Sequence, residues 1–318
     1  MPMPMPMPMP NLSAMREPRF TVLGGRGFIG SHLVRHLRRQ GHEVWVPERD
    51  DPALFERELG QVVYAIGLTA DFRRRPLDTV QAHVGVLRRV IDAARFDSLT
   101  YLSSTRVYAG AAGTSEAAAL RVDPNAPGDL YNLSKLLGEA LCLHCGHTGM
   151  KVVRLANIVG APPATGRDSG AANFIDALID AGRRTGQVRL QTSLASSKDY
   201  LGIDAAVDLL ARIALASDTG IFNLASGCNV SNAEIKRLIE LETGWDVSVA
   251  PDAPTWGFAP IDVSRVTRRF ALPPRALAGS FTTSFTALLR AAITATATAT
   301  ATAPSAITAP SHLEGTAA

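Results

Sequence analysis

Tyr131 and Lys135 are the residues of this sequence whose types and spacing most directly suggest chemistry. They stand four residues apart in the segment Tyr-Asn-Leu-Ser-Lys, so a helix would place both side chains on one face. A free tyrosine has a pKa of about 10 and is a poor base at neutral pH, but a neighbouring ammonium favours the phenolate. The pair therefore predicts a tyrosine that exchanges a proton with a substrate, assisted by Lys135.

Two serines end the apolar segment that precedes this helix. Residues 99–104 have the pattern of a buried strand, and Ser103 and Ser104 close it. Side chains alternate along a strand, so the two hydroxyls should face opposite sides. One of them can hydrogen-bond the substrate oxygen that Tyr131 protonates or deprotonates. The strand and the helix expected at 131–146 together predict a catalytic group of serine, tyrosine and lysine.

Gly24, Gly27 and Gly30 form a G-x-x-G-x-x-G pattern near the start of the chain. An apolar segment, 19–23, precedes the pattern, and apolar residues with helical spacing follow it over 29–37. The first glycine permits a tight turn, the second lets the backbone approach a pyrophosphate, and the third lets the helix pack closely on the strand. The free N–H groups at the helix start attract phosphate. The pattern predicts a dinucleotide-binding turn.

Further residues should line the dinucleotide site and select its cofactor. Glu48 and Arg49 follow the second expected strand, 44–46, where the adenosine ribose should lie. A carboxylate accepts both ribose hydroxyls and favours NAD, whereas an arginine grips a 2′-phosphate and favours NADP. We expect NAD through Glu48, with NADP through Arg49 as the alternative. The other expected cofactor contacts flank the glycine turn or end the next strand: Phe28, Ile29, Ala65 and Gly67.

Strands and helices alternate through the first half of the sequence. The expected strands lie at 19–23, 44–46, 61–66, 99–104 and 151–155. Apolar residues with helical spacing separate them, over 29–37, 78–95 and 131–146. This alternation predicts an α/β fold with a Rossmann doubly wound parallel sheet. We place the dinucleotide-binding domain at 19–157 and a smaller, mainly substrate-binding region at 158–288.

These motifs resemble the extended short-chain dehydrogenase/reductases, the family of nucleotide-sugar epimerases, dehydratases and reductases. The resemblance covers residues 19–285, and its motifs are the glycine turn, 101–108, 131–135, 154–157 and 198–200. It implies that Ser104 is the catalytic serine, because Ser104 lies three residues before Val107. It also implies a bound nicotinamide cofactor, with Lys135 on the nicotinamide ribose, and a homodimer.

The resemblance implies substrate contacts as well, and this chain departs from the family at some of them. Ser104, Thr105, Asn157 and Lys198 should touch the substrate. Dehydratases of the family place acids directly after the catalytic serine or threonine, where this chain has Thr105 and Arg106, so we expect no 4,6-dehydratase activity. Lys198 stands where nucleotide-sugar enzymes carry a diphosphate-binding arginine, and a lysine lacks the bidentate fork.

Two more departures affect the expected substrate. His83 replaces a helix asparagine and should pack near the cofactor, and residues 255–258 read Thr-Trp-Gly-Phe where a further phosphate-binding arginine is expected. The sequence predicts an NAD(P)-dependent epimerase or oxidoreductase that acts on a nucleotide sugar by hydride transfer through a keto intermediate. The alternative is a reductase or dehydrogenase of a small non-nucleotide carbonyl compound, which the missing arginine favours.

Composition and the two ends of the chain argue against other classes of protein. A net charge of +3 over 318 residues does not favour a nucleic-acid binder, and no apolar run reaches the ~18 residues of a membrane span. Three cysteines without a secretion signal indicate a cytoplasmic protein, and no ligand spacing predicts a metal site. Residues 1–18, with their Met-Pro repeats, and the Thr-Ala-rich 289–318 are expected to be disordered tails.

Overall fold

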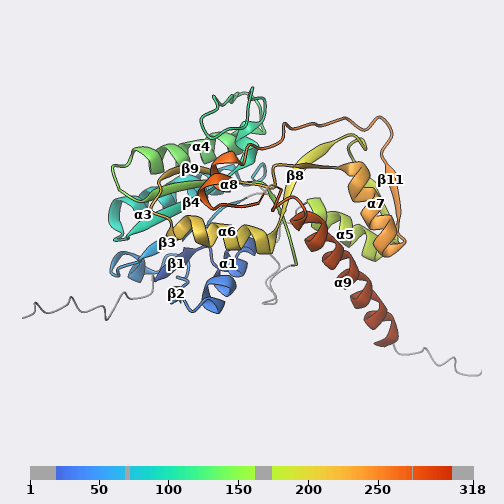
Figure 1. The fold of residues 1–318 in the computed structure, drawn as a ribbon, viewed down its shortest axis with the longest axis horizontal. Coiled ribbons are helices and arrows are strands. Elements are labelled where there is room, and N and C mark those ends of the chain that lie inside the picture. Colours follow the sequence, from blue (N-terminus) through green and yellow to red (C-terminus); the bar gives the residue numbers. More distant parts are fainter. Residues whose placement is uncertain (1–18, 69–71, 162–173, 274, 303–318) are drawn as a thin grey trace, which may run out of the picture.

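A parallel sheet of six strands forms the centre of the larger lobe (Figure 1). The computed structural model describes residues 19–68, 72–161, 174–273 and 275–302. All neighbouring strands of this sheet run parallel. Their order is β2 (Val44–Trp45), β1 (Phe20–Leu23), β3 (Gln61–Tyr64), β4 (Ser98–Ser104), β5 (Met150–Leu155) and β9 (Gly220–Leu224). The predicted Rossmann-type α/β fold is therefore confirmed.

Helices cover both faces of this sheet (Figure 1). One pair is α1 (Phe28–Arg39) with α6 (Ile203–Leu215), and the other pair is α3 (Val86–Ala93) with α4 (Asp129–His144). Successive residues of a strand enter different cores: Val63 packs with α1 and α6, whereas Val62 packs with α3 and α4. Because both faces are buried, the strands consist of continuous apolar runs rather than alternating ones.

The strand order reverses at β1, which has β2 on one side and β3 on the other. In an open parallel sheet, a crevice for ligands lies beyond the carboxyl ends of the strands at such a reversal. The glycine turn, 24–30, follows β1, and residues 65–67 follow β3. Both predicted nucleotide-binding segments therefore lie at this crevice.

A short π-helical turn interrupts the helical segment that follows β3. The sequence predicts one helix over 78–95, and the structure has α2 (Pro76–Val80), the π-helical η2 (Gln81–Gly85) and α3 in succession. Two 3₁₀ turns, η1 (Pro52–Phe55) and η3 (Thr105–Tyr108), follow β2 and β4. Such π-turns are frequent at functional sites, and η2 carries His83.

The second half of the chain adds a smaller lobe beside the sheet (Figure 1). Its strands form a three-stranded sheet of β10 (Asn229–Ser231), β8 (Ser197–Gly202) and β6 (Asn157–Val159), and a pair of β11 (Asp246–Val249) and β7 (Gln187–Leu190). Its helices are α5 (Phe174–Thr185), α7 (Asn232–Thr243) and α9 (Ser280–Thr302). The expected substrate region, 158–288, also supplies α6, β9 and α8 (Ser264–Arg269), which pack with the Rossmann core.

The expected tail at 289–318 begins inside a helix. Helix α9 extends to Thr302, and Leu289 and Ala292 are buried in the core of the smaller lobe. Leucine and alanine are strong helix formers. The apolar side of α9 packs against the smaller lobe, a contact that the Thr-Ala repeats gave no reason to expect. The expected disorder is therefore wrong for 289–302, while 1–18 and 303–318 lie outside the described residues.

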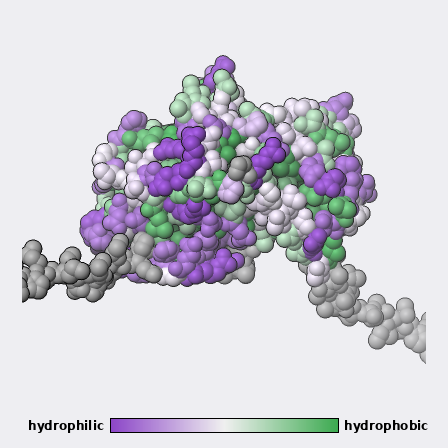
Figure 2. Space-filling view, in the orientation of Figure 1, coloured by the Kyte–Doolittle hydropathy of each residue, from purple (hydrophilic) through white to green (hydrophobic). Residues whose placement is uncertain are grey.

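Of the helices in the described ranges, none is both long and apolar enough to cross a membrane. Figure 2 shows hydrophilic residues distributed over the visible face of both lobes, with apolar residues between them.

The burial of α9 leads to a first prediction. Phe285 is completely buried and stacks on Phe281 at 5.2 Å between ring centres. Phe285→Ala should lower the free energy of unfolding by about 3–5 kcal/mol, because it leaves a cavity in the smaller lobe. Ile293→Ala, on the exposed side of the same helix, should cost less than about 1 kcal/mol. Urea denaturation of both variants measures the difference, and equal effects would show that α9 is not docked.

Candidate active site

Tyr131 and Lys135 lie in the first two turns of α4, and both side chains are buried. The ammonium of Lys135 donates a hydrogen bond to the carbonyl oxygen of Leu102 in β4, with 2.8 Å between Nζ and O. The same Nζ lies 5.9 Å from the centre of the Tyr131 ring. The helical period thus brings the two predicted groups together beside the carboxyl end of β4.

The charge of Lys135 is sensitive to its surroundings. Burial lowers the pKa of Lys135 to about 7, and the carboxylate of Glu139, one turn further along α4, opposes this shift. The side chain therefore changes charge near neutral pH. When charged, it favours the phenolate of the neighbouring tyrosine and offers N–H donors to the hydroxyls of a ligand.

The two serines at the end of β4 have different partners. The hydroxyl of Ser103 donates to the carboxylate of Glu139 at 2.5 Å, inside the protein. The hydroxyl of Ser104 accepts from the backbone N–H of Arg106 at 3.2 Å and so caps the 3₁₀ turn η3. This difference agrees with the alternation of side chains along the strand. Ser104 is partly exposed, as a group that is to meet substrate must be.

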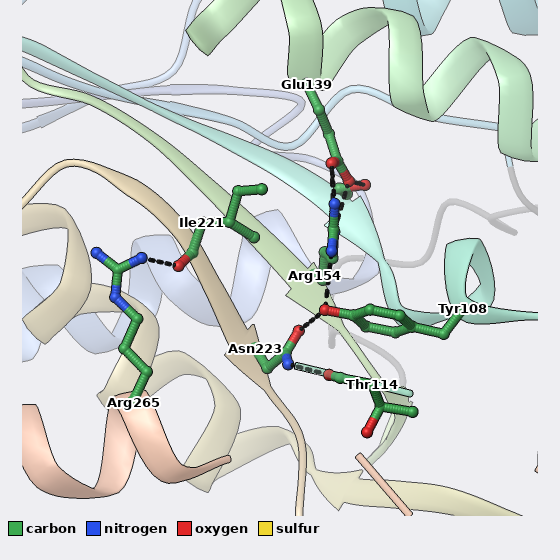
Figure 3. A network of polar contacts seen from close by, with 8 residues as sticks. Tyr108, Thr114, Glu139, Arg154, Ile221, Asn223 and Arg265 are labelled. Atoms are coloured by element: carbon green, nitrogen blue, oxygen red, sulfur yellow. Dashed lines mark hydrogen bonds and ion pairs between the residues drawn. The ribbon is translucent and has the colours of Figure 1, made fainter. Parts of the chain in front are cut away.

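A buried polar network joins the strand ends beneath this site (Figure 3). Its centre is the ion pair of Glu139 in α4 with Arg154 in β5, 2.6 Å between Oε2 and Nη2, with both side chains 4% exposed. Arg154 also donates to the hydroxyl of Tyr108 at 2.8 Å, and that hydroxyl donates to Asn223 in β9 at 2.8 Å. The network thus fixes α4, β4, β5, β9 and the end of η3 relative to one another.

His83 supports the first turn of α4 from the other side. Its Nδ1 lies 2.8 Å from the hydroxyl of Ser134, and that hydroxyl donates to the carbonyl oxygen of Tyr131 at 2.9 Å. Since the serine proton is used there, Nδ1 of His83 must be the donor to Ser134. Burial, with the charge of Lys135, lowers the pKa of His83 to about 3. The imidazole is therefore neutral at physiological pH, with Nε2 as an acceptor.

The glycine turn has no room for side chains at its first and third glycines. Gly24 has a φ of +81°, and a Cβ on it would lie 2.8 Å from the carbonyl carbon of Ala65. A Cβ on Gly30 would lie 2.3 Å from the carbonyl oxygen of Gly24. Gly27 occupies the N-cap of α1 without a side-chain cap. The turn therefore presents bare backbone at a helix N-terminus, which fits a phosphate group.

Gly67 connects the nucleotide crevice with the predicted catalytic pair. A Cβ on Gly67 would lie 3.3 Å from Nε2 of His83 and 3.5 Å from Nζ of Lys135. The backbone that follows β3 thus passes directly in front of the lysine. A dinucleotide that extends from the glycine turn past residues 65–67 would reach Lys135, so these residues fit a nicotinamide cofactor. Phe28 and Ile29, at the start of α1, pack partly buried against the adjacent core.

The acid predicted to select the cofactor already has a partner. Glu48 forms a bidentate ion pair with Arg26, which lies within the glycine turn, and both side chains are largely exposed. Arg49 is exposed at the same corner. Sequence reasoning did not single out Arg26, although it is the cation within the glycine pattern. The pair places one negative and one positive group together where the adenosine ribose is expected.

The predicted substrate residues of the smaller lobe lie on two adjacent strands, Asn157 in β6 and Lys198 in β8. Asn157 donates its amide to the backbone carbonyl of Asp199 at 2.8 Å. Lys198 lies between three aromatic rings, 5.8 Å from the centres of Phe174 and Trp256 and 5.9 Å from that of Phe258. Burial lowers the pKa of Lys198, and the charge of Arg106 lowers it further. Lys198 of the smaller lobe and Arg106 of η3 are thus close enough to affect each other electrostatically.

Sequence reasoning missed the aromatic rings that surround Lys198. Residues 255–258 appeared only as a place where an arginine is absent. In the structure the backbone N–H of Ser197 donates to the carbonyl of Trp256 at 3.0 Å, which holds that segment alongside β8. Trp256 is 52% exposed. The signal in the sequence was the pair of aromatic residues at 256 and 258, which the structure places around the half-buried Lys198.

The fold and these motifs now define the class of protein. A sequence profile of the NAD dependent epimerase/dehydratase family matches residues 20–225, and the chain belongs to this family. The resemblance to extended short-chain dehydrogenase/reductases is therefore confirmed.

One of the relatives is named as a dehydrogenase and another as an epimerase. The chain is 30% identical over 296 residues to the dTDP-6-deoxy-L-talose 4-dehydrogenase (NAD(P)(+)) of Kitasatospora kifunensis, covering 81% of this chain and 91% of that protein. It is 25% identical over 277 residues to the UDP-glucose 4-epimerase of Mycolicibacterium smegmatis, covering 74% and 84%. Among solved structures, MoeE5 in complex with UDP-glucuronic acid and NAD has the same fold, with a TM-score of 0.69 at 20% identity over 86% of this chain and 99% of that one.

The buried lysine leads to a prediction about stability and pH. The pKa of Lys135 is about 7 in the folded protein against an ordinary 10.5, so the unfolded chain binds more protons between these values. The contribution of Lys135 to stability therefore increases as the pH rises from 7 toward 10.5. Lys135→Met should abolish turnover but raise the free energy of unfolding at pH 7 by ~1–3 kcal/mol, a discounted share of the ~1.4 kcal/mol per pKa unit.

Urea denaturation of both proteins at pH 7 and pH 9, without added nucleotide, measures this effect. The advantage of the Lys135→Met variant should be smaller at pH 9. A variant that is less stable than the wild type at both pH values would show that the folded protein gains more from this ammonium than burial costs.

The Arg26–Glu48 pair leads to a prediction about cofactor choice. Glu48→Gln removes the charge that repels a 2′-phosphate and releases Arg26 to bind it. The affinity for NADP relative to NAD should rise by about tenfold or more. Calorimetric titration with both cofactors measures the ratio, and Glu43→Gln, at an exposed acid paired with Arg19, is the matched control. An unchanged ratio would remove Glu48 and Arg26 from cofactor selection.

Proposed function

We propose that this protein transfers hydride at carbon 4 of a nucleoside diphosphate sugar, as an NAD(P)-dependent epimerase or oxidoreductase. The observation that carries this proposal is the approach of the nucleotide-binding backbone to the proton-transfer pair: Gly67 lies directly in front of Lys135, and Lys135 lies beside Tyr131. Choice of carbon 4 is supported by the names of the relatives, which are a 4-dehydrogenase and a 4-epimerase.

Each residue of the catalytic group has a distinct part in this proposal. The phenol of Tyr131 takes the proton from the sugar hydroxyl in the oxidative direction and returns it in the reductive direction. Ser104 donates a hydrogen bond to the same sugar oxygen. Lys135 favours the phenolate and holds the hydroxyls of the nicotinamide ribose. The nicotinamide ring, when bound, accepts or supplies the hydride.

The smaller lobe would hold the nucleotide part of the substrate. The charge of Lys198 suits a diphosphate, and its aromatic surroundings exclude water, which strengthens a charge-assisted contact. The amide of Asn157 can support the same group. The exposed ring of Trp256 offers a flat surface for a nucleobase. This arrangement is an alternative to the arginine expected at 255–258.

Two outcomes of the reaction share this catalytic group. An epimerase retains its cofactor, rotates the keto sugar and reduces it from the other face, whereas an oxidoreductase releases the keto product. We do not expect the 4,6-dehydratase reaction, because Thr105 and Arg106 stand in the positions of the acids that eliminate water. A reductase of a small carbonyl compound is the second candidate, since no arginine accompanies Lys198 in 255–258.

Tyr131 provides the direct test of this function. The wild-type protein, incubated with NAD and UDP- or dTDP-linked glucose and galactose, should yield either the 4-epimer or a 4-keto sugar, and no 4-keto-6-deoxy sugar. Tyr131→Phe should lower kcat by about 10²–10⁴-fold with nearly unchanged cofactor affinity, because only the phenolic hydroxyl is lost. Product analysis by mass spectrometry and NMR decides between the outcomes.

Activity of the Tyr131→Phe variant close to that of the wild type would remove the tyrosine from its proposed part. Formation of a 4-keto-6-deoxy sugar would contradict the exclusion of dehydratase activity. Binding of none of the nucleotide sugars would favour the small-carbonyl reductase.

A further inference from the structure

Arg106 directs its guanidinium group against the proposed catalytic tyrosine. Its Cζ lies 5.4 Å from the centre of the Tyr131 ring and 4.9 Å from that of Phe72. Nη2 donates to the carbonyl oxygen of Gly128 at 3.2 Å, just before α4 begins. Ser104, the proposed partner of the substrate oxygen, lies two residues earlier on the same turn. The guanidinium is thus held beside the place where the sugar hydroxyl would lose its proton.

Two further cations act near Arg106, namely Arg73 and Lys198. Nη2 of Arg73 and Nη2 of Arg106 would lie 3.7 Å and 3.2 Å from a Cβ on Gly128, and the charge of Arg106 lowers the pKa of Lys198 in the smaller lobe, in addition to burial. Within the part of the chain that the structure describes, none of the three forms an ion pair.

Asp129, whose charge acts on Arg106, has other partners. The carboxylate of Asp129 attracts Arg106 and raises its pKa, against the larger effect of burial, which lowers it. The same carboxylate accepts hydrogen bonds from the backbone of Asp123 at 2.9 Å and from the amide of Asn132 at 2.8 Å. Arg106 and Lys198 are half-buried and Arg73 is exposed, and like charges that lose hydration repel one another more strongly. Within the described residues, the positive charge of this cluster is therefore not balanced by an ion pair.

Arg106 and Lys198 have different surroundings. In the proposed function the diphosphate lies against Lys198, which is surrounded by aromatic rings in the smaller lobe. Arg106 lies against the ring of Tyr131, which is proposed to meet the reacting carbon. An anion that binds Arg106 must therefore be attached to the sugar itself, within one or two carbons of that position.

We propose that Arg106 binds a carboxylate of the sugar, so that the substrate is a nucleoside diphosphate uronic acid. This inference rests on the proposed function. In a hexuronate the carboxylate carbon is attached to carbon 5, next to carbon 4, where hydride transfer is proposed. The group that holds the carboxylate must then lie beside the group that moves the proton, as Arg106 lies beside Tyr131.

The geometry of Arg106 also suits a planar anion. An arginine matches a carboxylate with two parallel N–H···O bonds, which a lysine cannot form. The rings of Phe72 and Tyr131 hold the plane of the guanidinium group, and the bond to Gly128 uses one of its five N–H donors. Donors remain for both oxygens of a carboxylate.

The test compares substrates that differ only at carbon 6. The full-length protein with its cofactor is assayed with UDP-glucose against UDP-glucuronic acid and UDP-galactose against UDP-galacturonic acid, and with the corresponding dTDP sugars. The wild type should prefer the acid of each pair in kcat/KM. Arg106→Gln should lower the ratio of acid to neutral sugar by about 10–100-fold, as expected for loss of a charge-assisted pair. Arg106→Lys should restore part of the preference.

The ratio separates recognition from support of the tyrosine. If Arg106 only positioned Tyr131, the variant would lose activity equally with both members of a pair, and the ratio would stay constant. Binding of UDP alone is measured as well, and an equal loss of UDP affinity in the Arg106→Gln variant would assign Arg106 to the diphosphate. Arg88→Gln, which removes an exposed arginine of α3, controls for net charge and should leave the ratio unchanged.

The outcomes distinguish this inference from the function on which it rests. Turnover of neutral nucleotide sugars without preference for the acids would overturn the part of Arg106 and leave the proposed function intact. Absence of binding to every nucleotide sugar in the panel would overturn both.

Discussion

The buried ion pair of Glu139 and Arg154 is the interaction on which the geometry of the site depends. Removing either charge from water is costly, and only close geometry with further hydrogen bonds compensates for it. Here the carboxylate receives Arg154 and Ser103, and the guanidinium also reaches Tyr108. Each of these partners comes from a different element, so α4, β4 and β5 cannot shift without leaving a charge unsatisfied. Tyr131 and Lys135 lie two turns and one turn before Glu139 in α4, so this constraint also fixes their positions.

Positive charge around the proposed active site is desolvated. Burial lowers the pKa of Lys135, Lys198 and Arg106, and the negative groups that act on Lys135 and Arg106 offset it only in part. Hydroxyl, phosphate and carboxylate groups of a bound nucleotide sugar would supply what these cations lack. In the proposed function, the same residues would cost stability in the empty protein and contribute affinity in the complex, a division that is common at binding sites.

Local sequence patterns were sufficient to predict the fold and the main motifs, whereas contacts between residues distant in the sequence were not predicted. The glycine turn and the Tyr131–Lys135 spacing are properties of one strand–helix junction and of one helix face, so the sequence was sufficient to predict them. Glu48 pairs with Arg26, 22 residues earlier in the sequence. This pair was missed because Glu48 was considered only as a ligand of the ribose hydroxyls. The sequence analysis considered Arg106 only as standing where dehydratases carry an acid. Its contact with Tyr131 depends on how η3 packs against α4, which the sequence does not reveal. The helix at 289–302 was missed because the Thr-Ala repeats hide that Leu289 and Ala292 find a surface on the smaller lobe.

The two edges of the central sheet differ in sequence but are closed to further strands in both cases. Edge β2 is two residues long, and Arg57 lies over its Trp45 at 4.5 Å. At the other edge, β9, the backbone N–H of Asn223 donates to Glu116, and the carbonyl oxygen of Ile221 accepts from Arg265 (Figure 3). At β9, side chains thus occupy hydrogen-bonding groups that an incoming strand would need, whereas at β2 the shortness of the strand limits pairing. Proteins use both devices to avoid aggregation by edge-to-edge pairing.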